Sequence, residues 1–234
     1  MFNLLSTANP KTLKGEAQGY VTYILHLAPS TLSGYNVCAK ATPGCIAACL
    51  NLAGRGGMFK RGETTNVIQK ARIRKTKMFF EHRDEFMISL VNDIKKAIAQ
   101  ARRNGKIPAF RLNGTSDLSW EKYEVPGTGL NIFDLFPTVQ FYDYTAVLGR
   151  KVADYPNYHL TFSRKENNEK DVQKALDAGM NVTVVYDEIP EGIYSADMTD
   201  LRFLDGSRGI IGLKAKGKAK KDYSGFVIRI NPKG

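Results

Sequence analysis

The feature that most constrains the fold is the alternation of short, strand-like segments with longer amphipathic segments along the chain. The strand-like segments are apolar runs rich in β-branched and aromatic residues, and each is bounded by Gly, Pro, Asn or Asp. They lie at 20–27, 107–112, 138–144, 158–164, 181–187, 209–215 and 225–230. Because strands that alternate with helices usually form a parallel sheet with crossover connections, the sequence predicts an α/β fold.

The segments between these runs supply the helices that such a sheet needs. Residues 84–103 show apolar side chains at the i, i+3, i+4, i+7 spacing, and Asn104-Gly105 then provides a left-handed stop. Residues 65–82 and 169–178 are predicted as further helices, and a fourth is expected shortly before Asn157. We therefore predict a single α/β domain over 1–234 with a mostly parallel sheet. A partial or distorted (β/α) barrel and an open sheet both accommodate these strands.

Length and composition exclude several classes of protein. Apolar residues make up 43 % of the 234 residues, which is enough for a hydrophobic core at this length. No apolar run approaches the ~20 residues of a membrane helix, and residues 1–19 lack the pattern of a signal peptide, so we expect a cytoplasmic protein without a membrane partner. The net charge of +11 permits an anionic partner, such as nucleic acid or a phosphorylated metabolite.

The three cysteines are the strongest indication of chemistry, because all of them fall in the loop 34–57 after the first predicted strand. Their pattern is Cys-x6-Cys-x3-Cys, at Cys38, Cys45 and Cys49. If the chain from residue 45 to 52 is helical, the last two sulfurs share one face. Three thiolates in a reducing compartment suit a [4Fe–4S] cluster, in which one iron remains open for water, substrate or another side chain.

Two other interpretations of these cysteines remain open. Zinc would need a fourth ligand, for which His26 is the best candidate because it lies near the end of the strand that leads into the loop. Free cysteines also often pack as small buried apolar residues. In favour of the cluster, Arg55 and the glycines around it offer positive charge and backbone N–H groups that would stabilise anionic sulfur.

Polar residues recur where the predicted strands end, and in parallel α/β folds such residues gather at one edge of the sheet. The set that we predict to line a cavity above the open iron, and to bind a small polar ligand there, is Asn113, Asp117, Asp143, Ser163, Arg164 and Asp187. No phosphate-binding P-loop and no local Ser-His-Asp arrangement accompanies this set.

Several sequence blocks resemble a family of tailed-phage proteins of the gene product 88 type. The blocks are TPGCIAACLNLAGRGG, RLNGTSDLSWE, FYDYT, LTFSR and GLKAKGKAKKD, and the resemblance extends from about Tyr20 to Ile230. It implies a phage-encoded protein that acts in the cytoplasm of the infected bacterial host. The family is named by gene order, so the resemblance implies no particular reaction.

A more distant resemblance connects the chain with radical S-adenosylmethionine enzymes, in which a cysteine triplet after the first strand of a partial (β/α) barrel holds a [4Fe–4S] cluster. That resemblance implies S-adenosylmethionine as a candidate ligand of the open iron. The chain departs from the pattern of those enzymes in its cysteine spacing. It also has Asn113-Gly114-Thr115-Ser116-Asp117 where a Gly-Gly-Glu motif would follow the second strand.

Two basic segments favour an alternative function. Residues 60–83 hold eight Lys or Arg against two Glu, and residues 214–221 hold five lysines. Either segment could follow a phosphate backbone. The leading hypothesis is therefore a phage iron–sulfur protein, in which radical chemistry of the S-adenosylmethionine type is one option. The alternative is a basic phage protein that binds nucleic acid and holds zinc or no metal.

Overall fold

The structure is a computed structural model that describes residues 3–7, 19–195 and 208–230. Its centre is a mixed sheet of nine strands within the described residues. The strands are β1 Leu5–Ser6, β2 Tyr20–Leu25, β3 Ile107–Arg111, β4 Gln140–Thr145, β5 Tyr158–Ser163, β6 Val182–Tyr186, β7 Tyr194–Ser195, β8 Ile210–Lys214 and β9 Val227–Ile228.

The sheet is mostly parallel and follows the order β1-β2-β3-β4-β5-β6-β8-β7, with β9 paired to β6 outside this path. Only the β1–β2 pair is antiparallel among the described pairs. The sheet does not close on itself. The predicted α/β class and the parallel sheet are therefore confirmed, and each of the seven predicted strands overlaps an observed one.

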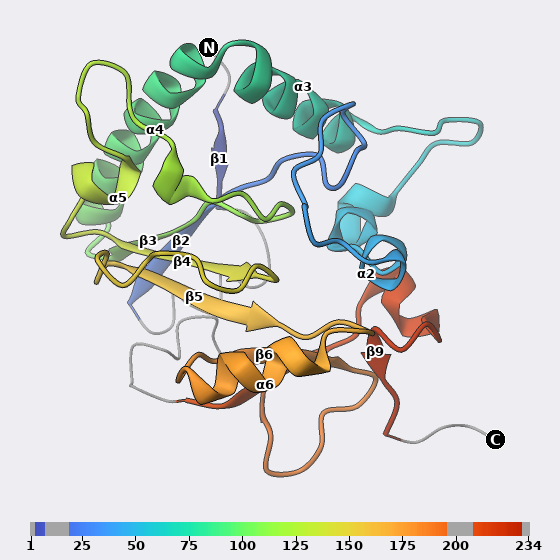
Figure 1. The fold of residues 1–234 in the computed structure, drawn as a ribbon. Coiled ribbons are helices and arrows are strands. Elements are labelled where there is room, and N and C mark those ends of the chain that lie inside the picture. Colours follow the sequence, from blue (N-terminus) through green and yellow to red (C-terminus); the bar gives the residue numbers. More distant parts are fainter. Residues whose placement is uncertain (1–2, 8–18, 196–207, 231–234) are drawn as a thin grey trace.

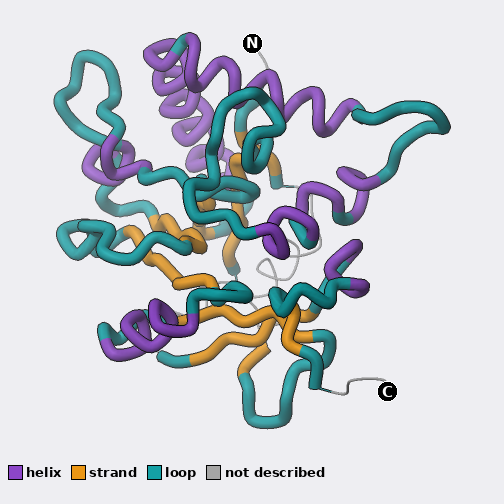
Figure 2. Tube along the Cα trace, turned by 45° about the vertical axis from the view of Figure 1, so that its right-hand side comes forward, coloured by secondary structure: helices purple, strands orange, loops and turns teal. Residues whose placement is uncertain are grey.

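The helices are α2 Pro43–Ala47, α3 Val67–Glu81, α4 Arg83–Arg103, α5 Ile132–Leu135 and α6 Glu169–Asp177. Short 3-10 turns lie at η1 Leu50–Leu52, η2 Gly54–Gly57, η3 Trp120–Lys122 and η5 Gly217–Lys221. Helix α4 packs on β3, whereas α6 packs on β5 and β6, so the long helices cover separate parts of the sheet (Figure 1, Figure 2). Among the described residues, no helix combines the length and the hydrophobicity that crossing a bilayer requires.

The predicted helix before Asn157 is wrong, because the chain between β4 and β5 forms turns. Gly149 has a φ of +70° in this segment, which belongs to a turn and not to a helix. The next residue, Arg150, carries a side chain that is only 3 % exposed and binds Glu121. The inward-pointing side chain in this segment therefore belongs to an ion pair, whereas a helix packed on the sheet would need an apolar face here.

A large apolar cluster packs α3 and α4 on β2, β3 and β4. Phe79 of α3 makes edge contacts with Phe86 and Trp120 at ring-centroid distances of 5.2 Å. The apolar face predicted for α4 is buried as expected, from Met87 to Ala101. Full burial of a side chain of this size contributes about 1.5–3 kcal/mol. This core therefore anchors α3 and α4 on the first strands of the sheet.

Candidate functional site

A cavity of about 230 Å³ lies where the parallel strands end, and all three cysteines line it. Its wall also contains residues from the ends of β3, β4, β5, β6 and β8. In Figure 1 the arrow of β5 points toward α2 and β9, which mark this end of the sheet. The cysteine loop and the strand ends therefore border the same cavity.

The cysteine loop is held in shape by local hydrogen bonds. The side chain of Thr42 caps α2 and accepts a hydrogen bond from the backbone N–H of Cys45 at 3.3 Å. Helix α2 ends at Ala47, so Cys49 lies beyond it and caps η1 instead. The expectation that Cys45 and Cys49 share one helical face is therefore wrong, because the helix stops after five residues. Both cysteines nevertheless line the same cavity.

The thiols lie close enough to influence one another's ionisation. Burial, with a smaller contribution from the neighbouring Cys49 and Cys45, raises the pKa of Cys38 to about 11, although a hydrogen bond from Ser30 N acts in the opposite direction. Burial likewise raises the pKa of Cys45 and of Cys49. The positive charge of Lys165 acts against this shift at Cys45, and that of Arg72 does so at Cys49.

The donor set fits an iron–sulfur cluster by its chemistry. Three thiols share one cavity, and two of them already accept backbone hydrogen bonds, from Ser30 N at 3.4 Å and from Asn51 N at 3.5 Å. Such N–H···S contacts are the ones that stabilise cluster-bound thiolates. No group of three or more His, Cys, Asp or Glu side chains in the described part of the chain is arranged around a single metal-ion position. A [4Fe–4S] cluster needs a different arrangement of ligands, because each of the three thiolates binds a separate iron atom.

His26, the residue suggested as a zinc ligand, does not line the cavity. Its Nδ1 lies 3.5 Å from the hydroxyl of Ser6, and its ring packs against Gly114. Burial lowers the pKa of His26 to about 3, with Arg72, Arg111 and Lys75 adding to the shift. The imidazole is therefore neutral at physiological pH, but it does not line the cavity of the thiols.

The structure brings four of the six predicted ligand-binding residues into the cavity wall, namely Asn113, Asp117, Ser163 and Arg164. Asp143 lies behind this wall, where it is 1 % exposed and accepts a hydrogen bond from Asn113 N at 2.7 Å. Asp187 lies elsewhere, because its carboxylate pairs with Arg229 at 3.6 Å and accepts a hydrogen bond from Ile230 N.

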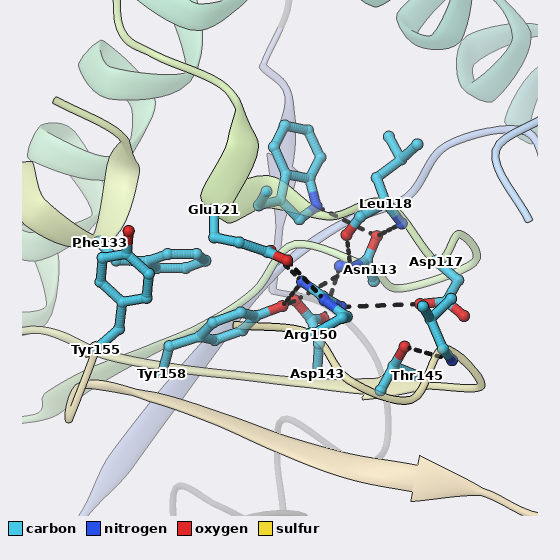
Figure 3. A network of polar contacts seen from close by, with 12 residues as sticks. Asn113, Asp117, Leu118, Glu121, Phe133, Asp143, Thr145, Arg150, Tyr155 and Tyr158 are labelled. Atoms are coloured by element: carbon cyan, nitrogen blue, oxygen red, sulfur yellow. Dashed lines mark hydrogen bonds and ion pairs between the residues drawn. The ribbon is translucent and has the colours of Figure 1, made fainter. Parts of the chain in front are cut away.

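A buried polar network supports the wall from behind (Figure 3). Arg150 donates to both carboxylate oxygens of Glu121, at 3.0 and 2.5 Å, and also to the hydroxyl of Tyr158. A second acidic group, Asp117, lies 3.9 Å from the guanidinium. Asn113 Oδ1 accepts hydrogen bonds from Ser116, Leu118 and Trp120, which fixes the loop after β3. Hydrogen bonds within the protein therefore hold the side chain of Asn113 and the loop after β3 in place.

Sequence reasoning missed three contributors to the site, namely Arg111, Lys165 and Glu166. The first two line the cavity, and Glu166 accepts hydrogen bonds from Thr42 and Gly44 at the start of α2. The signal that could have found Arg111 and Lys165 is position, since Arg111 is the last residue of β3 and Lys165 follows β5 closely. Nothing in the sequence pairs Glu166 with the cysteine loop.

Comparison with known proteins gives one match. A family model described as Gene product 88 matches residues 3–230, which is almost the whole chain. No curated protein and no solved structure matches the chain. The distant likeness to radical S-adenosylmethionine enzymes thus has no support from these comparisons.

Proposed function

The chain belongs to the Gene product 88 family of phage proteins, and we propose that it is an iron–sulfur protein that binds one [4Fe–4S] cluster through Cys38, Cys45 and Cys49. One observation carries the proposal: the three cysteines of the chain, all from one loop, line the same cavity at the strand ends. Thiolates are the ligands that iron–sulfur clusters require. The site of action is then the cytoplasm of the infected host, where thiols stay reduced.

The cavity wall gives the cluster a place to bind a small molecule. Three protein thiolates leave one iron without a cysteine, and Asn113, Asp117 and Ser163 supply polar groups to the same cavity. When bound, the cluster would supply a Lewis-acidic iron and a redox centre. The chain's own residues would bind and orient the ligand, and the rigid network behind Asn113 would keep those groups in place.

S-adenosylmethionine belongs to this proposal as one candidate ligand of the open iron. The strands from β2 to β6, followed by β8, are neighbours in sequence order, which is the order of the strands in a partial (β/α) barrel. Adding S-adenosylmethionine to the reduced protein should change the electron paramagnetic resonance spectrum of the cluster if it binds the iron. An unchanged spectrum at millimolar concentration, with no 5′-deoxyadenosine formed, removes this candidate and leaves the cluster.

The test of the cluster is anaerobic reconstitution followed by iron and acid-labile sulfide analysis. The wild-type protein should bind both, and Cys38→Ser, Cys45→Ser or Cys49→Ser should each destabilise or remove the cluster. The matched control is His26→Ala, which lies outside the cavity and should retain full iron content. Full iron and sulfide in all three cysteine variants would refute the assignment. Loss of iron in the histidine variant would instead point to His26 as a fourth ligand.

A second candidate function is nucleic-acid binding, which the location of the basic segments favours. A Cβ added at Gly217 of η5 would lie only 3.4 Å from Ala53, and η2 of the same loop contacts α3, so both basic segments border the cysteine loop. Lys70 and Lys77 are exposed on α3. Retention of DNA or RNA that falls steeply with salt, and that is lost in Lys70→Glu with Lys77→Glu, would support this function. Unchanged cluster content with no measurable retention would exclude it.

A further inference from the structure

The mouth of the cavity that contains the thiols lies between the cysteine loop and the lysine-rich segment 214–221. Among the described residues that line the cavity, those that are also exposed to solvent are Leu50, Lys214 and Lys216. Leu50 belongs to η1, which contacts η5 of the lysine-rich segment. Figure 1 shows this segment, in red, beside α2. A molecule that reaches the cavity through this opening therefore passes the lysines first.

Small residues alternate with lysines along this segment and leave the lysines at the surface. Ala215 and Ala219 are buried and pack with Ala48 of the cysteine loop. All five lysines of the segment are exposed, namely Lys214, Lys216, Lys218, Lys220 and Lys221. Like charges held this close together repel one another, and a bound anion would relieve that repulsion. The sequence of the segment thus presents a row of positive charges beside the mouth of the cavity.

The acidic residue that follows these lysines does not neutralise them. The carboxylate of Asp222 is buried, and one of its oxygens accepts a hydrogen bond from Ser224 Oγ at 2.8 Å. The other oxygen accepts a hydrogen bond from Val227 N at 3.1 Å. Within the part of the chain that the structure describes, no ion pair involves the lysines of η5, which are Lys218, Lys220 and Lys221. Their charge is therefore available to an anion outside the protein.

An exposed aromatic ring lies next to the lysines of η5. Tyr223 is 83 % exposed, and the guanidinium of Arg229 lies 4.5 Å from the centroid of its ring. Arg229 also donates hydrogen bonds to the carbonyls of Lys220 and Asp222, each at 2.8 Å, so one side chain holds both the ring and the end of η5. Exposed rings beside rows of cations bind single-stranded nucleic acids, because bases stack on the rings while the cations follow the phosphates.

We propose that a single-stranded nucleic acid is the partner of the cluster site, with its phosphates on the lysines of η5, a base on Tyr223 and the strand across the mouth of the cavity. This inference deepens the proposed function and rests on it, because it makes nucleic acid the molecule that is brought to the cluster. Lysines bind phosphates as point charges and gain affinity from the release of counterions. Single strands of RNA and of DNA share this chemistry, and the experiment separates them.

The experiment measures the anaerobic binding of fluorescent oligonucleotides of about 16 nucleotides by anisotropy. The probes are oligo-dT, oligo-U and a DNA duplex of the same length. Each probe is titrated with the cluster-loaded protein and with the iron-free protein, and iron and sulfide are measured in the same samples.

The variants change exposed side chains, so they should fold like the wild type. One variant combines Lys218→Gln, Lys220→Gln and Lys221→Gln, and two others are Tyr223→Ala and Tyr223→Phe. The charge-matched control combines Lys95→Gln, Lys96→Gln and Arg102→Gln, which removes the same charge from exposed side chains of α4.

We expect at least one single strand to bind, and the duplex to bind at least about tenfold more weakly. The triple lysine variant should weaken binding by at least about tenfold. It should also reduce the slope of log Kd against log salt by about 2, since each phosphate contact on a single strand contributes about 0.7. Tyr223→Ala should weaken binding at least about fivefold, whereas Tyr223→Phe and the α4 control should bind like the wild type.

A second measurement tests the position of the strand at the cavity. On the cluster-loaded protein, a saturating oligonucleotide should slow the loss of visible absorbance in air, because the strand covers the mouth of the cavity. An unchanged rate of loss overturns the proposal, as does a duplex that binds as tightly as a single strand, or unchanged affinity in the triple lysine variant. A loaded cluster without binding of either strand overturns this inference alone. Strand binding that depends on the lysines of η5, in a protein that takes up no iron, overturns the proposed function alone.

Discussion

The carboxylate of Glu166, which follows β5, accepts a hydrogen bond from the hydroxyl of Thr42 at 2.6 Å. The other carboxylate oxygen accepts a hydrogen bond from the backbone N–H of Gly44 at 2.7 Å. Burial alone would raise the pKa of Glu166, but these hydrogen bonds outweigh it and hold the pKa below its usual value. One side chain from the far half of the chain thus fixes the first turn of α2, and with it the position of Cys45.

Removing this contact should loosen the cysteine loop. A hydrogen bond to a charged group contributes about 1.5–3 kcal/mol, but Glu166 is only half-buried and water replaces part of what is lost, so we expect Glu166→Ala to lower the free energy of unfolding by about 1–3 kcal/mol. The reconstituted cluster should also be lost faster in air, which is measured by the decay of visible absorbance. The control is Glu191→Ala, since Glu191 is an exposed loop residue. Equal decay rates for the Glu166 variant and the wild type would contradict the role of this contact.

Asp143 should make stability fall as the pH rises toward neutrality. Burial raises its pKa from 3.8 to about 7, against the opposing effects of Arg111, the Asn113 N–H, Arg150 and Tyr158. Between those two pH values the folded state holds a proton that the unfolded state has lost. The free energy of unfolding therefore decreases with pH in this window, with a slope of at most about 1.4 kcal/mol per pH unit.

The measurement is urea unfolding of the wild type and Asp143→Asn between pH 4 and pH 7, a window set by the pKa of Asp143. The amide cannot titrate, so this contribution to the slope should vanish in the variant. Absolute stability should also fall, because hydrogen-bond donors surround the site and an amide group presents two of its own. Asp154→Asn is the control, since Asp154 is exposed. Parallel curves for wild type and Asp143→Asn would show that Asp143 is ionised throughout.

Local sequence patterns predicted those parts of the fold that depend on local periodicity. The i, i+3, i+4 spacing of α4 and the short β-branched runs such as 182–186 correspond to observed elements, because burial of one face or of a whole strand leaves a direct trace in the sequence. The same patterns failed for the segment after β4. There the inward-pointing group is Arg150, and an ion pair leaves no periodic trace.

The candidate site was predictable where residues sit at strand ends or close together in the chain. Asn113 and Ser163 line the cavity because parallel strands bring their carboxyl ends to one edge. Asp187 satisfies the same rule but turns away, because Arg229 and the backbone of Ile230 bind its carboxylate. Contacts between distant segments, such as that of Glu166 with Gly44, depend on the whole fold and have no local signal.

Removing one partner of the ion pair between Arg150 and Glu121 should strongly lower the free energy of unfolding. Both side chains are nearly inaccessible, at 3 % and 6 % exposure. We expect Arg150→Met to lower the free energy of unfolding by about 3–5 kcal/mol, because it leaves the carboxylate of Glu121 buried without its partner. The double variant Arg150→Met with Glu121→Gln should recover much of this loss. A double variant less stable than the single variant would show that packing, and not the uncompensated charge, causes the loss.

The buried thiols should make cluster assembly depend on pH. Burial raises the pKa of each cysteine, for Cys38 to about 11, so the iron-free protein holds its thiols protonated at neutral pH. Iron binds the thiolate and must displace these protons, so uptake of iron and sulfide should improve as the pH is raised above neutrality.

Alkylation by iodoacetamide, followed by mass spectrometry, should find the iron-free protein slow to react and Cys38 slowest, since only the thiolate attacks. Reconstitution should then protect all three cysteines together. Protection of one or two cysteines only would contradict a cluster held by Cys38, Cys45 and Cys49.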